Sequence, residues 1–216
     1  MDWIPPLAAV LAAYLVGSLS FAVIVSRVMG LADPRSYGSK NPGATNVLRS
    51  GNRTAALLTL AFDALKGYVP VALALVYAPR LGLSETAVAF VGLAAFLGHL
   101  WPVFFRFQGG KGVATAAGVL LALQPGLGLA TLVSWALIAA FFRYSSLASI
   151  VAALFAPFYQ LLIWGVEPAL ACIVPMSLLL IWRHEGNIRK LLNGTESRLG
   201  QKAEAAPAHH RKGHSR

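Results

Sequence analysis

A glycine-rich stretch with a single lysine interrupts an apolar sequence at residues 107–115, which read Phe-Gln-Gly-Gly-Lys-Gly-Val-Ala-Thr. Glycines let backbone N–H groups turn toward a ligand, and a helix beginning at Val113 would add the positive end of its dipole. With Lys111, this combination suits an anion, above all a phosphate, held at Gly109, Gly110 and Gly112. A nucleotide P-loop is excluded, because it needs Gly at position 105 and Ser or Thr at position 112. An ordinary cytoplasmic turn with one positive lysine is an equally weighted alternative.

A second polar segment, residues 38–49, reads Gly-Ser-Lys-Asn-Pro-Gly-Ala-Thr-Asn-Val-Leu-Arg and contains no carboxylate. Its Pro-Gly pair predicts a tight turn, and hydroxyl, amide and cationic donors surround that turn. An ordinary polar loop would have a similar composition, but anion binding is favoured because loops on rigid scaffolds commonly carry function. The candidate ligand-binding residues are Ser39, Asn41, Thr45, Asn46 and Arg49.

Two charged residues, Asp63 and Lys66, lie inside a predicted apolar helix, three positions apart and therefore on one helix face. Asp63 lies nine residues past Thr54, about 14 Å along the axis at ~1.5 Å per residue. Ionised groups at such depth are costly unless they are paired or face a wet cavity. We expect a mutual pair that supports the site. His99, near the end of the next apolar run, is expected to be a hydrogen-bonded structural residue.

The last apolar run ends in Arg183, His184 and Asn187, and helical spacing would place all three on one face at the cytoplasmic surface. A positively charged flank explains the arginine but not the histidine and the asparagine. Ser146 and Ser149 lie three positions apart at the predicted start of another helix. All five residues are therefore candidates for the site.

Several catalytic signatures are missing from the sequence. No Cys/His cluster has metal spacing, no Gly-x-Ser-x-Gly elbow occurs, and Cys172 has no partner for an intrachain disulfide. His99 is followed five residues later by Phe104, and His184 by Arg189. The His-x4-Asp pair of thioester-using acyltransferases is therefore absent, and we expect neither a metal nor another cofactor.

The composition indicates that a bilayer surrounds these residues. Of 216 residues, 57% are hydrophobic and only 12% are charged, against roughly 25% charged in an average soluble domain. The net charge of +10 does not indicate nucleic-acid binding, because the positive residues lie between apolar runs instead of on one basic face.

The apolar runs predict an all-α integral membrane protein with about seven transmembrane helices, some of them short. Residues 33–53 are expected to form a polar loop, residues 1–200 one membrane domain, and residues 201–216 a basic, disordered cytoplasmic tail. A full crossing needs about 20 residues, and a shorter helix is acceptable where it lines a cavity. The expected spans are residues 3–30, 54–78, 86–105, 113–123, 127–142, 147–164 and 169–182.

The distribution of positive charge predicts the orientation in the membrane. Lys and Arg concentrate in residues 33–53, in residues 106–112, at Arg143 and from Arg183 onward. The loops on the other side carry only Arg80, beside three acidic residues. The N-terminus is therefore expected outside, with every motif-rich loop facing the cytoplasm.

Six motifs follow one another along the chain: Gly-Ser-Lys-Asn-Pro-Gly-Ala-Thr-Asn, Asp-Ala-Leu-Lys-Gly, Gly-His-Leu-Trp-Pro-Val-Phe, Gly-Gly-Lys-Gly-Val-Ala-Thr, Arg-Tyr-Ser-Ser-Leu-Ala-Ser and Arg-His-Glu-Gly-Asn-Ile. Together they resemble the bacterial acyl-phosphate:glycerol-3-phosphate acyltransferases of the PlsY type. The resemblance runs from about residue 8 to residue 198. Each motif alone is weak, whereas six in this order are highly specific.

The resemblance implies an enzyme of the bacterial inner membrane with its active site on the cytoplasmic side. It would transfer a fatty acyl group from acyl phosphate to the 1-hydroxyl of sn-glycerol 3-phosphate. The products would be lysophosphatidic acid and inorganic phosphate, in the first acylation of phospholipid synthesis. Membrane lipid would surround the enzyme, and the enzyme that makes acyl phosphate would be its functional neighbour. Phosphate is a good leaving group, so substrate alignment and oxyanion stabilisation would supply most of the rate.

The resemblance places Ser39, Thr45, Arg49, Lys111, Ser149, His184 and Asn187 at substrate-binding and catalytic positions, and Gly109 and Gly110 in a phosphate-binding loop. Together with the residue types, this predicts that the catalytic residues are Ser39, Arg49, Lys111, His184 and Asn187. Substrate binding is expected of Asn41, Thr45, Asn46, Gly109, Gly110, Gly112, Ser146 and Ser149, and a supporting role of Asp63, Lys66, His99 and Arg183.

A membrane transporter or exchanger of phosphorylated metabolites is the alternative function. Short helices and intramembrane charges fit that class as well. Against it stand the lack of internal repeats and the crowding of the polar motifs on one side of the membrane.

Overall fold

The computed structural model describes residues 3–200, and every regular element among them is helical. Helices α1 to α5 are Ile4–Gly17, Phe21–Val28, Ala44–Leu48, Arg53–Leu81 and Glu85–Leu100, followed by a 3₁₀ turn, Val103–Phe105. Helices α6 to α10 are Val113–Leu123, Pro125–Phe142, Ser145–Tyr159, Leu170–Arg183 and Glu185–Leu192, with a π-helical turn, Gln160–Trp164, after α8. The all-α prediction is confirmed for this part of the chain, and the predicted tail 201–216 lies outside the described residues.

Four segments among the described residues are long and apolar enough to cross a membrane: Arg53–Leu81, Glu85–Phe105, Pro125–Phe142 and Ser145–Trp164. The pair α1 and α2 makes a fifth if the two are taken as one bent span, and α6 and α9 are shorter apolar helices. These segments correspond to the runs expected from the sequence. The total of seven crossings and their orientation remain predictions.

The first predicted span, residues 3–30, is wrong as a single helix. It is broken at residues 18–20 into α1 and α2, whose axes are bent by 43°. A break inside a membrane exposes backbone carbonyls that need a donor. The ammonium group of Lys66 supplies one, because its Nζ donates to the carbonyl oxygen of Leu19 at 2.7 Å.

Three further boundaries differ from the sequence prediction. The polar loop 33–53 contains the short helix α3. The span 86–105 ends as a helix at Leu100, because the following Trp-Pro pair cannot continue it. The span 147–164 changes to a π-helical turn at Gln160, three residues after Pro157, whose ring removes a backbone donor.

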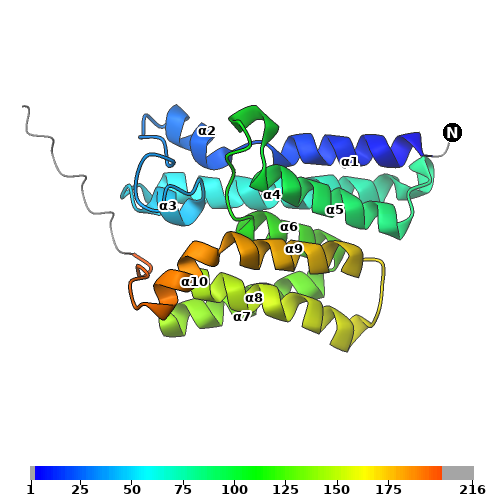
Figure 1. The fold of residues 1–216 in the computed structure, drawn as a ribbon. Coiled ribbons are helices and arrows are strands. Elements are labelled where there is room, and N and C mark those ends of the chain that lie inside the picture. The colour runs from blue at the N-terminus through cyan, green and yellow to red at the C-terminus, as the bar shows by residue number, and fades with distance from the viewer. Residues whose placement is uncertain (1–2, 201–216) are drawn as a thin grey trace, which may run out of the picture.

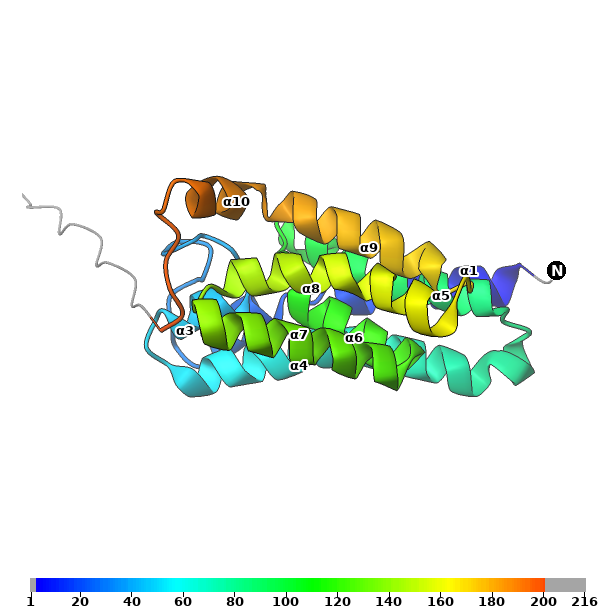
Figure 2. The ribbon, with the colours of Figure 1, turned by 90° about the horizontal axis from the view of Figure 1, so that it is seen from below.

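Glycines bring the central helices into backbone contact. A Cβ atom on Gly67 of α4 would lie 2.2 Å from the carbonyl oxygen of Thr115, and one on Gly118 of α6 would lie 2.0 Å from that of Ala64. Only a residue without a side chain permits this approach. Helix α6 therefore lies directly against α4, between the layer of α1, α4 and α5 and the layer of α7, α8 and α9 (Figures 1 and 2).

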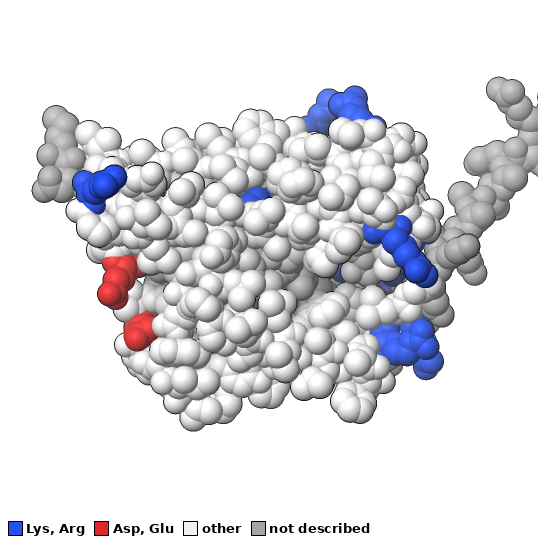
Figure 3. Space-filling model, turned by 180° about the vertical axis from the view of Figure 1, so that it is seen from behind, with Lys and Arg blue, Asp and Glu red and all other residues white. Residues whose placement is uncertain are grey.

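The polar elements gather at one end of the helix bundle. Helices α3 and α10 lie at this end in both views, while α1 begins at the opposite end (Figures 1 and 2). Most Lys and Arg side chains visible in Figure 3 lie at the same end as α3 and α10, and the acidic side chains visible there lie at the other. Helix α4, with 29 residues, is about 43 Å long at ~1.5 Å per residue, well beyond a hydrocarbon core of ~30 Å.

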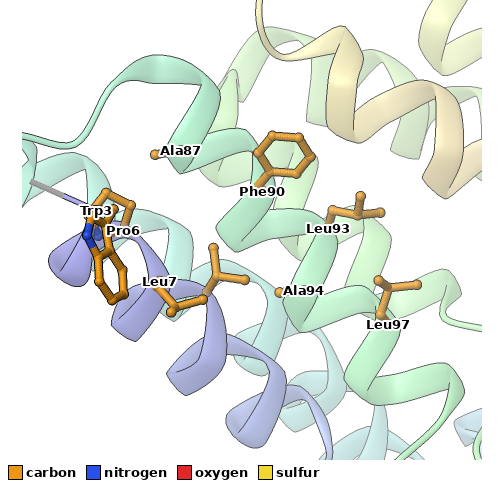
Figure 4. A pocket seen from close by; sticks show the side chains of 9 residues that line it. Trp3, Pro6, Leu7, Ala87, Phe90, Leu93, Ala94 and Leu97 are labelled. Carbon is orange, nitrogen blue, oxygen red and sulfur yellow. The ribbon is translucent and has the colours of Figure 1, made fainter.

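An apolar hollow of about 390 Å³ lies between α1 and α5, away from the polar end (Figure 4). Its walls include Trp3, Leu7, Phe90 and Leu93. No polar side chain suited to a phosphate lines it, so this hollow is not a phosphate site.

Candidate active site

The glycine-rich loop is packed tightly over the end of α5. A Cβ atom on Gly109 would lie 2.1 Å from the carbonyl oxygen of His99, and one on Gly110 would lie 2.2 Å from the Nε2 atom of the same histidine. Gly112 has a φ of +85°, and a Cβ atom there would lie 2.2 Å from the ring of Phe96. All three positions therefore require glycine for close approach or for backbone conformation.

Arg183 holds the loop from the side of α9. Its guanidinium donates to the carbonyl oxygens of Gly109 at 3.0 Å and Gly110 at 3.1 Å. The N–H of Gly110 donates to the carbonyl of His99 at 3.2 Å. The expectation of an open nest of amides is therefore wrong at Gly110, whose N–H is already bonded within the protein. Its glycine is needed for packing, and the hydrogen bonds of Arg183 agree with the supporting role predicted for it, which remains a prediction.

A polar cavity of about 310 Å³ opens beside this loop. Three segments build it: the 38–49 loop, the glycine-rich loop, and the α9–α10 junction. Four of the lining side chains are cationic and none is a carboxylate, which suits a phosphate dianion. The lining residues are Ser39, Lys40, Asn41, Gly109, Lys111, Arg183, Gly186, Asn187 and Lys190. Lys40, Gly186 and Lys190 were not predicted from the sequence, although Lys40 and Gly186 lie next to predicted residues.

Lys111 is the most enclosed cation of the cavity. Its Nζ donates to Oδ1 of Asn187, which brings the glycine-rich loop and α10 together. The pKa of Lys111 is lowered to about 8, mainly by burial and also by the positive charges of Arg49, Lys190 and Arg183, against the opposing effect of Glu196. A phosphate bound beside Lys111 would favour its charged form.

His184 lies at the junction between α9 and α10. Its Nδ1 lies 2.8 Å from the carbonyl oxygen of Leu180, so Nδ1 carries the proton and donates. The pKa of His184 is lowered to about 4, mainly by burial and also by the positive charge of Lys111. The imidazole is therefore neutral at pH 7.

The helical-face argument for residues 183–187 is wrong, although its conclusion partly holds. Helix α9 ends at Arg183 and α10 begins at Glu185, with His184 between them in a non-helical conformation. Arg183 and Asn187 nevertheless both line the cavity, while the buried His184 does not. The change of direction at His184 brings the side chains of Arg183, on α9, and Asn187, on α10, to the same cavity.

Glu196, which was not predicted from the sequence, is hydrogen-bonded to residues of the site. Its Oε1 accepts hydrogen bonds from Nδ2 of Asn187 and Oγ of Ser146, both at 2.7 Å. The carboxylate thus orients the amide that in turn bonds Lys111. A carboxylate is not an anion-binding donor, and the sequence signal was an acidic residue, the first of two in the basic segment after α10.

The segment containing Glu196 also bonds residues at the ends of α3 and α7. Arg49 donates to Oγ of Ser197, and the N–H of Leu199 donates to the carbonyl of Arg143 at 2.7 Å. Residues 196–199 therefore tie the ends of α3 and α7 to the site. Arg49 lies next to the cavity, and its charge reaches Lys111.

Four predicted substrate-binding residues are not among those that line the cavity. Asn46 is buried and uses its amide within the loop: Nδ2 donates to Pro34 and Tyr37 carbonyls, and Oδ1 accepts from the N–H of Ser39. Its direct contact with substrate remains a prediction without a geometric basis, whereas its shaping of the Ser39 backbone is visible. The hydroxyl groups of Thr45, Ser146 and Ser149 are bonded to Ser145 Oγ, Glu196 and the Ser145 carbonyl, respectively.

The expected pair of buried charges is present beneath the glycine-rich loop. Lys66 Nζ lies 2.8 Å from Oδ1 of Asp63, and Nδ1 of His99 lies 3.7 Å from the same oxygen. All three side chains are buried. The pairing is confirmed, and the supporting role of the three residues remains a prediction.

The arrangement agrees with known proteins over most of the chain. The sequence profile of the family described as glycerol-3-phosphate acyltransferase matches residues 7–194. Glycerol-3-phosphate acyltransferases of Burkholderia orbicola (strain MC0-3) and Ralstonia nicotianae are 63% and 65% identical over 203 and 191 residues. These alignments cover 93% and 88% of this chain and 96% and 92% of those proteins.

Two crystal structures of PlsY (YgiH), an integral membrane glycerol 3-phosphate acyltransferase, share the fold. Its glycerol 3-phosphate form is 39% identical with a TM-score of 0.84, covering 90% of this chain and 96% of that one. Its lysophosphatidic acid form is 38% identical with a TM-score of 0.81, covering 89% and 94%. The prediction of an all-α integral membrane protein is confirmed, and the chain belongs to the glycerol-3-phosphate acyltransferase family.

Proposed function

We propose that this enzyme transfers a fatty acyl group from acyl phosphate to the 1-hydroxyl of sn-glycerol 3-phosphate, forming lysophosphatidic acid and inorganic phosphate. The main support for this proposal is the cavity lined by four cationic side chains and no carboxylate, in a protein of apolar helices. Both substrates carry a phosphate, and one of them is also a lipid. The related PlsY structures hold glycerol 3-phosphate and lysophosphatidic acid, a substrate and a product of this reaction.

The proposed reaction exchanges one bond to the acyl carbon for another. The 1-hydroxyl oxygen attacks the acyl carbon, and the bond from that carbon to the phosphate oxygen breaks. Lys111 and Arg183 supply positive charge where the departing phosphate gains negative charge. Ser39 and Asn187 are the neutral donors in the same cavity and position the substrates.

The hydroxyl proton passes to the phosphate of the donor in this proposal. His184 has a pKa of about 4, so it is a weak base, and its side chain does not line the cavity. Glu196 already accepts hydrogen bonds from Ser146 and Asn187. Neither residue is placed to accept the proton, whereas the phosphate lies next to the hydroxyl by necessity.

We place the enzyme in the bacterial inner membrane with the cavity on the cytoplasmic side. The positive charge of the polar end supports this orientation, and a soluble metabolite such as glycerol 3-phosphate is met in the cytoplasm. The enzyme that produces acyl phosphate would then be its functional neighbour, because acyl phosphate is a reactive mixed anhydride.

The decisive experiment uses purified protein with acyl phosphate and glycerol 3-phosphate. We expect lysophosphatidic acid and inorganic phosphate in equal amounts, and no product when acyl-CoA replaces acyl phosphate. Protein carrying Lys111→Ala, purified in the same way, controls for contaminating acyltransferases. Turnover with acyl-CoA, or transport of glycerol 3-phosphate into vesicles without ester formation, would contradict the proposal.

A further inference from the structure

Thr115 occupies a central position that no role above explains. It lies in the first turn of α6, directly after the glycine-rich loop, and is completely buried. Its Oγ1 donates to the backbone carbonyl oxygen of Asp63 on α4 at 2.9 Å. The same Oγ1 lies 3.1 Å from Nδ1 of His99 on α5. One hydroxyl group thus connects three helices beneath the loop.

These two contacts determine the tautomer of neutral His99. A threonine hydroxyl has a single proton, and a carbonyl oxygen can only accept. The bond to Asp63 uses that proton, so His99 Nδ1 must be the donor in its contact with Thr115. Oδ1 of Asp63, 3.7 Å from the same nitrogen, also favours a proton there. Nε2 of the neutral ring is consequently unprotonated.

The unprotonated nitrogen faces the glycine-rich loop. The Cβ position of Gly110 would lie 2.2 Å from Nε2 of His99, so the ring packs edge-on against the Gly110 backbone. A rotated ring would present a different edge to the Gly110 backbone, and this close contact would change. The orientation of the His99 ring therefore determines the position of the Gly110 backbone, and with it that of the adjacent Lys111.

The helices that surround Thr115 are closely packed. Gly67 and Gly118 allow α4 and α6 to meet backbone to backbone on either side of it. Lys66 pairs with Asp63 on the same face of α4 and also donates to the Leu19 carbonyl at the break of the first span. A hydroxyl group bonded to such closely packed helices can hold the His99 imidazole in one orientation.

We propose that Thr115 is a positioning residue for phosphate binding: it fixes His99 as the Nδ1-protonated tautomer and so holds Gly110 and Lys111 in register with the cavity. The inference rests on the proposed function, since it assumes that the loop binds a phosphate. Thr115 itself does not line the cavity, so it acts through His99.

The test compares purified variants in their affinity for inorganic phosphate, measured by calorimetry. Thr115→Val is isosteric but removes the hydroxyl, and we expect roughly fivefold to tenfold weaker binding, the scale of one lost hydrogen bond. Thr115→Ser retains the hydroxyl and should bind within twofold of wild type. Thr131→Val is the matched control, because buried Thr131 also donates to a carbonyl, that of Leu127, but lies on α7 away from the loop.

Activity adds a second readout. In Thr115→Val we expect the KM for a phosphate-bearing substrate to rise more than kcat falls, whereas lost stability alone would reduce the amount of active protein with KM unchanged. If wild-type protein makes no lysophosphatidic acid, the proposed function fails, but the phosphate affinities still decide the role of Thr115. Equal affinity of Thr115→Val and wild type would overturn the inference, as would equal weakening in Thr131→Val.

A measurement on the wild-type chain covers the case in which Thr115→Val does not fold. The ¹⁵N spectrum of the histidine imidazoles, with the His99 signal assigned by its loss in His99→Gln, distinguishes the two tautomers. We expect a protonated Nδ1 and an unprotonated Nε2 at His99. A proton on Nε2 of the neutral ring would refute the inference.

Discussion

Replacement of Lys111 by alanine tests the candidate site most directly. The change removes the enclosed cation of a cavity of about 310 Å³ together with its hydrogen bond to Asn187. A hydrogen bond to a charged group contributes about 1.5–3 kcal/mol. At ~1.4 kcal/mol per factor of ten, kcat/KM should fall about 10- to 100-fold. We expect the upper part of that range, because the carboxylate of Glu196 loses a neighbouring cation.

The conservative variant and a matched control make the result interpretable. Lys111→Arg keeps the charge, but a planar guanidinium differs in shape from an ammonium group, so it should recover only part of the loss. Arg106→Ala removes a positive charge from the same loop region at an exposed position that does not line the cavity. It should leave kcat/KM unchanged, although it affects the positive-inside charge equally.

The assay is the initial rate of lysophosphatidic acid formation on equal amounts of folded protein. Size-exclusion chromatography and thermal unfolding establish that each variant is folded. The reasoning is refuted if Lys111→Ala stays within twofold of wild type, or if Arg106→Ala falls as far as Lys111→Ala. In either case the loop would act through membrane topology and not through phosphate binding.

Three further predictions concern pH, the missed carboxylate and topology. The pKa of Lys111 is lowered to about 8, so the positive charge that binds phosphate disappears as pH rises above that value. Above pH 8, kcat/KM should therefore fall about tenfold per pH unit. An identical pH–rate profile in Lys111→Arg would contradict this. Glu196→Ala leaves the donors of Ser146 and Asn187 without their acceptor, so unfolding experiments should show about 1–3 kcal/mol less stability, with a smaller loss in Glu196→Gln; equal stability of all three proteins would be inconsistent with the observed bonds. In intact cells or right-side-out vesicles, a cysteine at Ser84 should react with an impermeant reagent added outside, and one at Ser50 should not; the reverse pattern would invert the orientation.

The sequence by itself determined the class of the protein and most of its chemistry. An apolar composition with so few charges requires a bilayer, and apolar runs of helical length set the approximate spans, because hydropathy acts locally. The glycine-rich loop and the donor-rich 38–49 segment were recognisable for the same reason, since each function is carried by neighbouring residues. The order of six short motifs was specific enough to indicate the family.

Features that depend on residues distant in sequence were decided by the tertiary structure. The break between α1 and α2 is stabilised by Lys66, 47 positions past Leu19, and no local pattern announces that donor. Glu196 and Asn187 are joined only because the segment after α10 folds back over the site. The internal hydrogen bonds of Asn46 and Gly110, which shape the two loops, were visible only in the structure, and their contact with substrate remains a prediction.

The contrast has one physical origin. Periodicity and composition reflect how each residue partitions between water and lipid, and that preference is written along the chain. A hydrogen bond between α6 and α5, such as that of Thr115 with His99, depends on the angle and distance at which two helices meet. Those are set by the close contacts at Gly67 and Gly118, so the sequence supplied the side chains of the site while packing chose their partners.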